Sequence, residues 1–174
     1  FFTGPPTKFS LTQDLVAQFE TNDLRKSHWV KSITNGSQVW YHAYKYKRDI
    51  ATPTSVENSI VLRLAEQFLI RAEARAKQGD LIGAKEDLNV IRQRAGLSNT
   101  TAVTTDQVLS AILQERRLEL FTELGHRFLD LKRLQLLDFV LGTKPGWSTH
   151  DKLWPLPQAE MDVNPFLVPQ NPGY

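Results

Sequence analysis

Residues 60–96 read IVLRLAEQFLIRAEARAKQGDLIGAKEDLNVIRQRAG, a helical pattern that is interrupted once, at Gly79-Asp80. On both sides of the interruption, apolar and small side chains recur at three- and four-residue steps, which stacks them on one side of a helix. These residues are Val61, Leu64, Ala65, Phe68, Leu69, Ala72 and Ala76 before the break, and Leu81, Ala84, Leu88 and Ile91 after it. Gly96 follows as a residue typical of helix C-termini. The stretch predicts two amphipathic helices that fold back on each other.

Small residues recur where the two helices must touch. Ala72 on the first helix and Ala84 on the second allow the backbones to approach closely, with Phe68 and Leu88 filling the space beside them. This is the arrangement of one tetratricopeptide-type helical pair, and no second copy at that period is visible in the sequence. Any other helical hairpin is an equally good interpretation of the pair alone.

Length and composition limit the classes of protein to consider. With 174 residues the simplest organisation is one domain, and no apolar run approaches the ~20 residues that span a bilayer. The chain has no cysteine, which excludes disulfides and thiolate chemistry, and its net charge of +2 comes from interleaved acids and bases, which argues against a nucleic-acid partner. It opens with FFTGPP, without an initiator methionine or a leader, so we expect a piece or processed product of a longer protein.

The first segment, residues 1–55, is predicted to contain a loop, a short helix and a strand. Residues 1–9 are rich in Pro and Gly, and Ser10-Leu11-Thr12-Gln13 has the spacing of a capping box for a helix that ends near Asn22. The buried side of that helix is expected to consist of Leu11, Leu15, Val16 and Phe19.

Aromatic residues gather in the second half of this segment. A polar stretch with a lone Trp29 leads through the turn Asn35-Gly36 to residues 39–47, whose alternation predicts a strand. One side of that strand is an aromatic strip formed by Trp40, His42, Tyr44 and Tyr46. Because no Trp or Tyr lies between Ala51 and Gly146, these rings either fasten loops to the helices or form a platform for a ligand.

The helical scaffold is predicted over residues 56–141, and a capping box at Thr54-Ser55-Val56-Glu57 is expected to start it. A third long helix, over residues 108–141, is expected to bend or restart at Gly125. Residues 142–174 contain six prolines and three glycines, which forbid long helices, so we predict an irregular C-terminal wrap.

Arg116 falls in the middle of the apolar side of the third helix. An unpaired buried charge costs roughly 3–5 kcal/mol, so this guanidinium needs a carboxylate partner. Glu119, Glu66 and Glu73 are the candidates.

Motifs for catalysis or metal binding are weak. The four histidines, at positions 28, 42, 126 and 150, are too scattered to define a metal site. Glu115 and Glu119 could be imagined as a glycosidase pair, but Arg116 and Arg117 on the same helix are expected to hold both carboxylates ionised. No nucleophile motif or phosphate-binding glycine loop is present, so an enzyme is disfavoured.

A series of short motifs runs in a fixed order through the second half of the chain. They are Arg63-Leu64-Ala65-Glu66, Leu69-Ile70-Arg71-Ala72-Glu73-Ala74, Asp87-Leu88-Asn89, Ile91-Arg92, Arg94-Ala95-Gly96-Leu97, Ile112, Glu115-Arg116-Arg117, Glu119-Leu120, Arg127-Phe128-Leu129-Asp130-Leu131, Arg133, Leu153-Trp154-Pro155-Leu156-Pro157, Asn164-Pro165 and Gln170-Asn171-Pro172-Gly173-Tyr174. In order and spacing the series resembles the C-terminal part of the SusD/RagB family. Upstream, residues 22–26 with Trp29 resemble the family's segment before that helix, although Leu24 stands where Pro is often seen.

This resemblance implies an all-α fold, with a tetratricopeptide-like helical hairpin, further long helices, extensive irregular loops and a short β segment. It implies a surface-exposed outer-membrane lipoprotein, anchored through an N-terminal Cys that is not in these residues, which binds nutrient oligosaccharides, and in some members peptides, without cofactor or catalysis. The implied partner is a SusC-like, TonB-dependent transporter barrel. Because family members are longer, residues 1–174 are expected to be the C-terminal portion of one domain, with an apolar surface that the missing N-terminal portion covers.

The expected ligand site is a shallow aromatic platform with a polar edge, because sugars present flat C–H faces and rims of hydroxyl groups. We assign Trp29, Trp40 and Tyr44 to the platform and His42 to its edge. A structural ion network is expected to comprise Arg71, Glu73, Glu115, Arg116 and Arg117. Two alternatives stay open: a helical-repeat adaptor for another protein, with Trp40 and Tyr44 buried, and a carbohydrate-cleaving enzyme, which fails if its two carboxylates are buried against arginines.

Overall fold

α-Helices make up most of the regular structure in the computed structural model, which describes residues 9–47, 54 and 57–174. The chain divides into two units, Phe1–His126 and Arg127–Tyr174. Among the described residues, the β structure consists of one two-stranded sheet and an isolated bridge. The fold class expected from the sequence, all-α with a short β segment, is confirmed.

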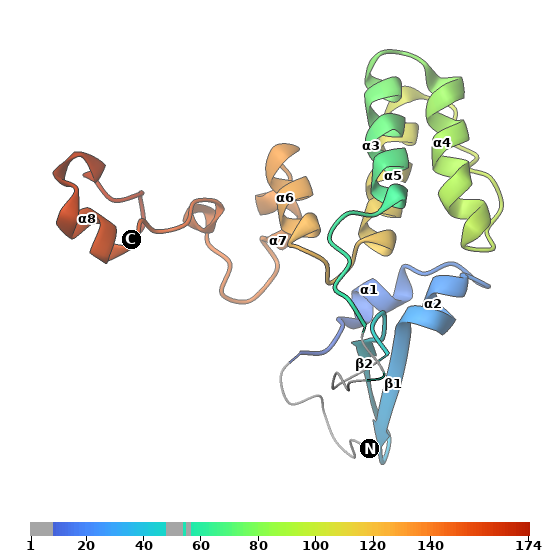
Figure 1. Ribbon diagram of the computed structural model, residues 1–174, viewed down its shortest axis with the longest axis horizontal. Coiled ribbons are helices and arrows are strands. Elements are labelled where there is room, and N and C mark those ends of the chain that lie inside the picture. The colour runs from blue at the N-terminus through green and yellow to red at the C-terminus, as the bar shows by residue number, and fades with distance from the viewer. Residues whose placement is uncertain (1–8, 48–53, 55–56) are drawn as a thin grey trace. The chain divides into compact units, whose positions relative to one another are not determined.

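Three helices form the scaffold of the first unit and lie side by side in Figure 1: α3 (Leu64–Lys77), α4 (Leu81–Arg94) and α5 (Thr105–Glu119). The predicted α3–α4 hairpin is confirmed. It turns at Gly79, whose φ is +86°, and the side chain of Asp80 accepts the N–H of Gly83 to cap α4. The three helices share one apolar core, formed by Ala65, Leu69, Ala72, Ala76, Ala84, Leu88, Ile91, Val108 and Ile112.

The first scaffold helix begins later than its sequence pattern predicts. Arg63 has an extended backbone, with φ −124° and ψ 135°, and α3 starts only at Leu64. The guanidinium of Arg63 is held by the carboxylates of Glu119 and Glu123, which fixes the chain in an extended path up to the first helical turn. Val61 therefore lies outside the helix and is exposed.

The later start also changes which residues the helix buries. Leu64, predicted on the apolar face, is 72% exposed, and Phe68 is half-buried at the edge of the core. The predicted capping box at 54–57 lies partly outside the described residues, and residues 57–63 are not helical.

The third long helix predicted over residues 108–141 is three shorter ones. They are α5, α6 (His126–Arg133) and α7 (Leu137–Leu141). Thr122, Leu124 and Gly125 have positive φ values of 58°, 41° and 73°, a backbone that a right-handed helix cannot contain. The predicted restart after Gly125 is confirmed, but the preceding helix already ends at Glu119.

Two short helices precede the sheet in the first unit. In α1 (Gln13–Ala17) the cap is Thr12, whose hydroxyl accepts the N–H of Leu15, so the capping box predicted at Ser10 was wrong by two residues. The second helix, α2 (Leu24–Trp29), was not predicted, because its six residues are too few to show an apolar period. The Asp23 side chain caps it through the N–H of Arg25.

The sheet is an antiparallel hairpin of β1 (Val30–Asn35) and β2 (Gln38–Ala43). Its turn lies at the predicted position, with Gly36 at φ +57°. The strand predicted over residues 39–47 is shorter, and β1 was missed. The inner face of the hairpin packs on a second apolar cluster, formed by Leu11, Val16, Phe19, Val30, Leu118 and Phe121.

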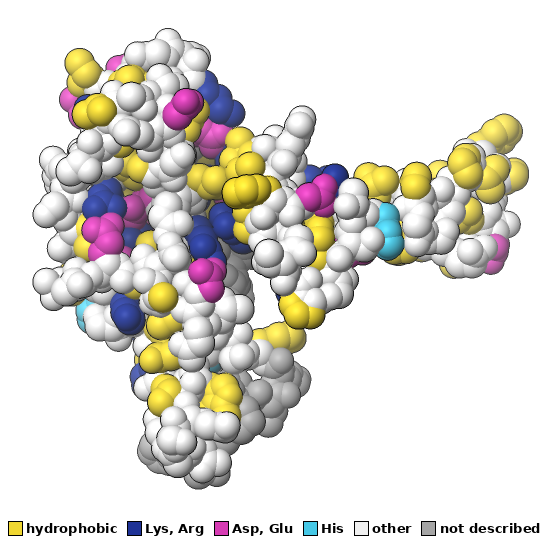
Figure 2. Space-filling view, turned by 180° about the vertical axis from the view of Figure 1, so that it is seen from behind, with side chains coloured by type: hydrophobic (Ala, Val, Ile, Leu, Met, Phe, Trp, Pro, Cys, Tyr) yellow, Lys and Arg dark blue, Asp and Glu magenta, His cyan; other side chains and the backbone are white. Residues whose placement is uncertain are grey.

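The second unit ends in short helical turns: η1 (Thr149–Lys152), α8 (Gln158–Val163) and η2 (Pro165–Leu167). Gln170, after η2, is tied back to Leu156, before α8, because its side chain accepts the N–H of Leu156 and donates to the carbonyl oxygen of Leu156. Hydrophobic side chains gather on the surface of this C-terminal segment in Figure 2, and the most exposed are Trp154, Val163, Phe166 and Val168. The prolines thus limit helix length, as predicted.

Candidate functional site

One face of the β1–β2 hairpin carries aromatic and basic side chains. The register pairs Lys31 with His42 and Ile33 with Trp40, and because strand residues alternate, these four side chains share the face opposite the apolar cluster. Tyr44, just after β2, meets His42 edge to face with ring centroids 6.4 Å apart. The structure therefore brings Trp40, His42 and Tyr44 together, and we call this surface the outer hairpin face.

Lysine ammonium groups surround the Tyr44 ring. The Nζ atoms of Lys31 and Lys47 lie 3.7 Å and 3.8 Å from its centroid, within the range of cation–π attraction. His42 Nδ1 lies 3.0 Å from the carbonyl oxygen of Ala43, which can only accept, so Nδ1 is the donor. In the neutral ring, Nε2 is then an acceptor on a half-buried side chain.

The inner face of the same hairpin is held against the rest of the unit. Tyr41 and Ala43 pack against the second apolar cluster, and the carbonyl oxygen of Tyr41 accepts the N–H of Leu11 at 2.7 Å. The N–H of Tyr44 donates to the carbonyl oxygen of Trp29, also at 2.7 Å. These contacts fix the backbone that carries the outer hairpin face.

Trp29, the fourth predicted ligand residue, does not join the other three. Its ring packs against Phe121 with centroids 6.5 Å apart, and cationic groups of Lys45, Arg63 and Arg94 lie 4.8–5.7 Å from the ring centroid. The side chain is half-buried among these groups, so this ring fastens the segment to the helices.

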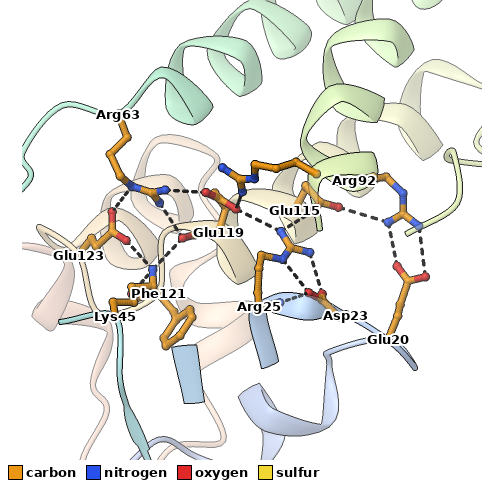
Figure 3. Close-up of polar contacts among 11 residues, drawn as sticks. Glu20, Asp23, Arg25, Lys45, Arg63, Arg92, Glu115, Glu119, Phe121 and Glu123 are labelled. Atoms are coloured by element: carbon orange, nitrogen blue, oxygen red, sulfur yellow. Dashed lines mark hydrogen bonds and ion pairs between the residues drawn. The ribbon is translucent and has the colours of Figure 1, made fainter. Parts of the chain in front are cut away.

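Between the two apolar clusters lies a set of linked charged side chains, which we call the central ion network (Figure 3). Its members are Glu20, Asp23, Arg25, Lys45, Arg63, Arg92, Arg94, Glu115, Glu119 and Glu123. Basic and acidic groups are equal in number, so their formal charges cancel.

Arg25, on α2, is the member that joins the short helices to α5. Its guanidinium donates to Asp23 at 2.8 Å and to Glu115 at 2.6 Å, and its side chain is 3% exposed. Burial disfavours the charged form of Arg25 and by itself would lower its pKa. The hydrogen bond to Asp23 and the charge of Glu115 outweigh burial, so the pKa of Arg25 is raised. The guanidinium therefore stays charged inside the unit.

Glu115 and Glu119 receive opposite pKa shifts from similar surroundings. Burial raises the pKa of Glu115 despite Arg25 and Arg92, whereas at Glu119 burial is outweighed by hydrogen bonds and charges from Arg94 and Arg63, and the pKa falls. From the sequence, Arg116 and Arg117 were predicted to hold both carboxylates ionised. At Glu119 the arginines that lower the pKa are instead Arg94 and Arg63, and at Glu115 desolvation outweighs the nearby arginines.

Neither carboxylate is open to a substrate. Glu115 is 2% exposed and Glu119 is 0% exposed, and the oxygens of both accept hydrogen bonds from arginines. The carbohydrate-cleaving alternative was expected to fail if these two carboxylates were buried against arginines, and the structure shows that they are.

Lys45 turns away from the outer hairpin face and ends in the network. Its Nζ donates to the carbonyl oxygens of Glu119 and Phe121 and to the carboxylate of Glu123. Burial, only partly offset by Glu123, lowers the pKa of Lys45 to about 8. A pocket of about 210 Å³ adjoins this group, and it is lined by Trp29, Lys45, Tyr46, Glu57, Asn58, Ile60, Arg63 and Glu123.

The five residues predicted as a structural ion network have varied surroundings. Glu115 is a member of the central ion network. For the others, Arg71 donates two hydrogen bonds to Asp87, Glu73 contacts Lys77 at 2.9 Å, Arg116 lies 3.5 Å from Glu66, and Arg117 contacts Asp14. Glu66 is one of the three partners that the sequence suggested for the buried Arg116.

Residues 9–47, 54 and 57–174 lack two further features, a cluster of metal ligands and a membrane-spanning helix. Within these residues, no three or more His, Cys, Asp or Glu side chains are grouped so that they could hold a metal ion. No helix within them has the length and apolar character needed to cross a membrane.

This chain has relatives among known proteins. The model of the SusD family matches residues 14–145, which is more than half of the chain. The chain belongs to the SusD family. Among its curated relatives, SusD-like protein P38 of Formosa agariphila is 32% identical over all of this chain and 42% of its own length. The starch-binding protein SusD of Bacteroides thetaiotaomicron is 29% identical, over 83% of this chain and 27% of its own length.

Solved structures of the SusD family share the fold. A SusD superfamily protein from Bacteroides vulgatus superposes with a TM-score of 0.77 at 27% identity, over 95% of this chain and 44% of its own. Surface glycan-binding protein A from Bacteroides uniformis superposes with a TM-score of 0.67 at 25% identity, over 92% of this chain and 40% of its own. This chain thus spans less than half the length of each of these relatives and structural neighbours.

Two residues of these sites, Lys31 and Arg25, were not predicted from the sequence. Lys31 was missed because β1 was interpreted as a polar connection, although the β-branched residues Val30, Ile33 and Thr34 just before the Asn35-Gly36 turn favour a second strand. Arg25 was missed as a network member because its partner Glu115 is 90 positions away in the sequence, and no local pattern indicates such a pair.

Proposed function

We propose that this protein binds nutrient oligosaccharides at the cell surface without chemically changing them. The observation that carries the proposal is the outer hairpin face, where Trp40, His42 and Tyr44 lie together on a backbone fixed from behind. Aromatic rings stack on the C–H faces of sugars, and polar groups at their edge hydrogen-bond to hydroxyls. Peptides are a second class of nutrient that such a face could bind.

The comparisons support this proposal at the level of the family. A relative is named a starch-binding protein, and a structural neighbour is named a surface glycan-binding protein. We extend the proposal to delivery of the ligand to a SusC-like, TonB-dependent transporter barrel. We also propose a location at the outer membrane, with a lipid anchor on an N-terminal Cys beyond these 174 residues and an N-terminal portion that completes the domain.

Binding without catalysis is the form of activity that the described residues favour. Glu115 and Glu119 were the best candidates for a pair of catalytic carboxylates, and both are buried among arginines. The proposed activity therefore consists of binding the ligand and delivering it to the transporter.

Calorimetric titration with a panel of oligosaccharides tests the proposal. We expect binding to at least one member, and we expect Trp40→Ala to weaken it about tenfold, which is roughly 1.4 kcal/mol, because the main stacking surface is lost. Trp154→Ala is the matched control, since it removes an exposed tryptophan of the second unit. Absence of binding to every sugar, together with no association with a transporter barrel, would refute the proposal and leave the helical-repeat adaptor.

A further inference from the structure

The outer hairpin face has an unbalanced charge. Residues 30–47 contain three lysines and one histidine, and no aspartate or glutamate. Lys45 is turned inward and is matched by Glu123, so Lys31, Lys47 and His42 are the basic residues next to the aromatic rings. Many of the described arginines elsewhere in the first unit lie beside carboxylates, among them Arg25, Arg63, Arg71 and Arg94, and Figure 2 shows basic and acidic side chains side by side on one face.

The two lysines differ in how much of their charge is available. Lys47 Nζ donates to the carbonyl oxygens of His28 and Tyr44, and the Glu57 carboxylate lies close by, where it accepts the backbone N–H of Lys47 at 2.6 Å. Lys31 is exposed, and its ammonium lies over the Tyr44 ring without an ion-pair partner among the described residues. A ring attracts a cation but does not neutralise it, so the N–H groups of Lys31 that point away from the ring can bind an anion.

From this arrangement we propose that the outer hairpin face selects negatively charged oligosaccharides, whose uronate carboxylates or sulfate esters bind Lys31 while a sugar ring stacks on Trp40. The inference rests on the proposed function and specifies its ligand class. The register supports it, because Lys31 and Trp40 are diagonal neighbours on one face of the sheet, within reach of adjacent groups of one saccharide.

A nucleic acid is the competing anionic ligand, and the charge distribution disfavours it. Nucleic-acid sites need a stripe of cations that follows many phosphates, and their affinity scales with the number of phosphates neutralised. The net charge here is only +2. Among the described residues, the Lys31 ammonium has no ion-pair partner and the Lys47 ammonium is partly occupied by carbonyl oxygens, which fits a ligand with few, spaced negative groups.

The test compares ligands that differ only in charge. An oligogalacturonate and its neutral methyl ester form one pair, and a sulfated galactan oligosaccharide and its desulfated form make the other. We expect the protein to bind at least one charged form about fivefold or more tightly than its neutral partner in 20 mM salt. The advantage should shrink in 500 mM salt, because exposed charges are screened.

Substitutions of Lys31 test whether the hairpin is the source of the preference for charged sugars. Lys31→Met keeps an unbranched apolar side chain next to Tyr44 but removes the charge, and it should weaken binding of the charged form about two- to fivefold while the neutral form is unaffected. Lys31→Arg should restore the preference. Lys77→Met is the control, since it removes one charge at the far end of α3 from the hairpin.

The possible outcomes separate this inference from the proposed function. Equal affinity for charged and neutral forms would overturn the inference and leave sugar binding intact. A preference for charged sugars that is undiminished in Lys31→Met would also overturn it, because the selecting group would lie elsewhere. Equally tight binding of an oligonucleotide of the same charge would overturn selection of saccharides, and binding of no saccharide at all would refute the proposed function itself.

Discussion

Replacing Glu119 with Gln tests whether the central ion network holds the first unit together. Glu119 is 0% exposed, and its carboxylate accepts hydrogen bonds from Arg63 at 2.6 Å, from Arg25 at 3.4 Å and from Arg94. The amide keeps the shape of the side chain but leaves three guanidinium groups without their shared counter-charge. Breaking a buried ion pair costs about 3–5 kcal/mol. We expect about 3 kcal/mol, the lower end, because the Arg94 side chain is 46% exposed and water can solvate it.

Urea unfolding at pH 7 measures this loss through tryptophan fluorescence, to which Trp29 contributes from its position against three cations of the network. Such a loss is a large part of the ~5–15 kcal/mol by which domains are stable. Asp14→Asn is the control, because it breaks an ion pair with Arg117 in which Asp14 is 68% exposed, and it should cost less than about 1 kcal/mol. If Glu119→Gln lowers the free energy of unfolding no more than Asp14→Asn does, the network is not a main source of stability.

Two more predictions concern Lys45 and the helical core. Burial lowers the pKa of Lys45 from 10.5 to about 8, so the unfolded chain holds this proton more tightly. The free energy of unfolding should therefore rise as pH increases from 8 to 10.5, by at most about 3 kcal/mol, and urea titrations of Lys45→Met should lack that rise. Ala84→Leu, at a position 0% exposed, should lower stability by about 1–3 kcal/mol in thermal unfolding, whereas Ala74→Leu, on the exposed side of α3, should stay within about 0.5 kcal/mol. Equal effects of the two leucines would contradict close helix packing.

The scaffold could be predicted because its determinants are local. The apolar period of α3 and α4 and the Gly79-Asp80 break act within a few residues, so the pattern alone predicts the hairpin. The C-terminal end of α5 could not be predicted from such a local pattern. Thr122 and Leu124 adopt positive φ without a glycine to signal it, and only contacts within the folded unit stabilise that backbone.

The candidate site was predicted only where strand alternation reveals it. Trp40, His42 and Tyr44 were assigned to one side, and the observed register places them so. Trp29 could not be assigned by the same reasoning, because it ends a helix of six residues and its surroundings come from Phe121 and from distant cations. Its position is set by tertiary packing, which no local pattern encodes.

The central ion network explains how one unit contains two separate apolar clusters. Ile112 on α5 belongs to the helical core and Leu118 to the cluster under the hairpin, and Glu115 lies between them on the same helix. A charged layer at this level costs desolvation energy, and that cost is offset only if each charge meets a partner in one particular arrangement. An apolar layer would tolerate a slip of the hairpin against the helices, whereas these paired charges allow one position, so the layer supplies the orientation that the outer hairpin face requires.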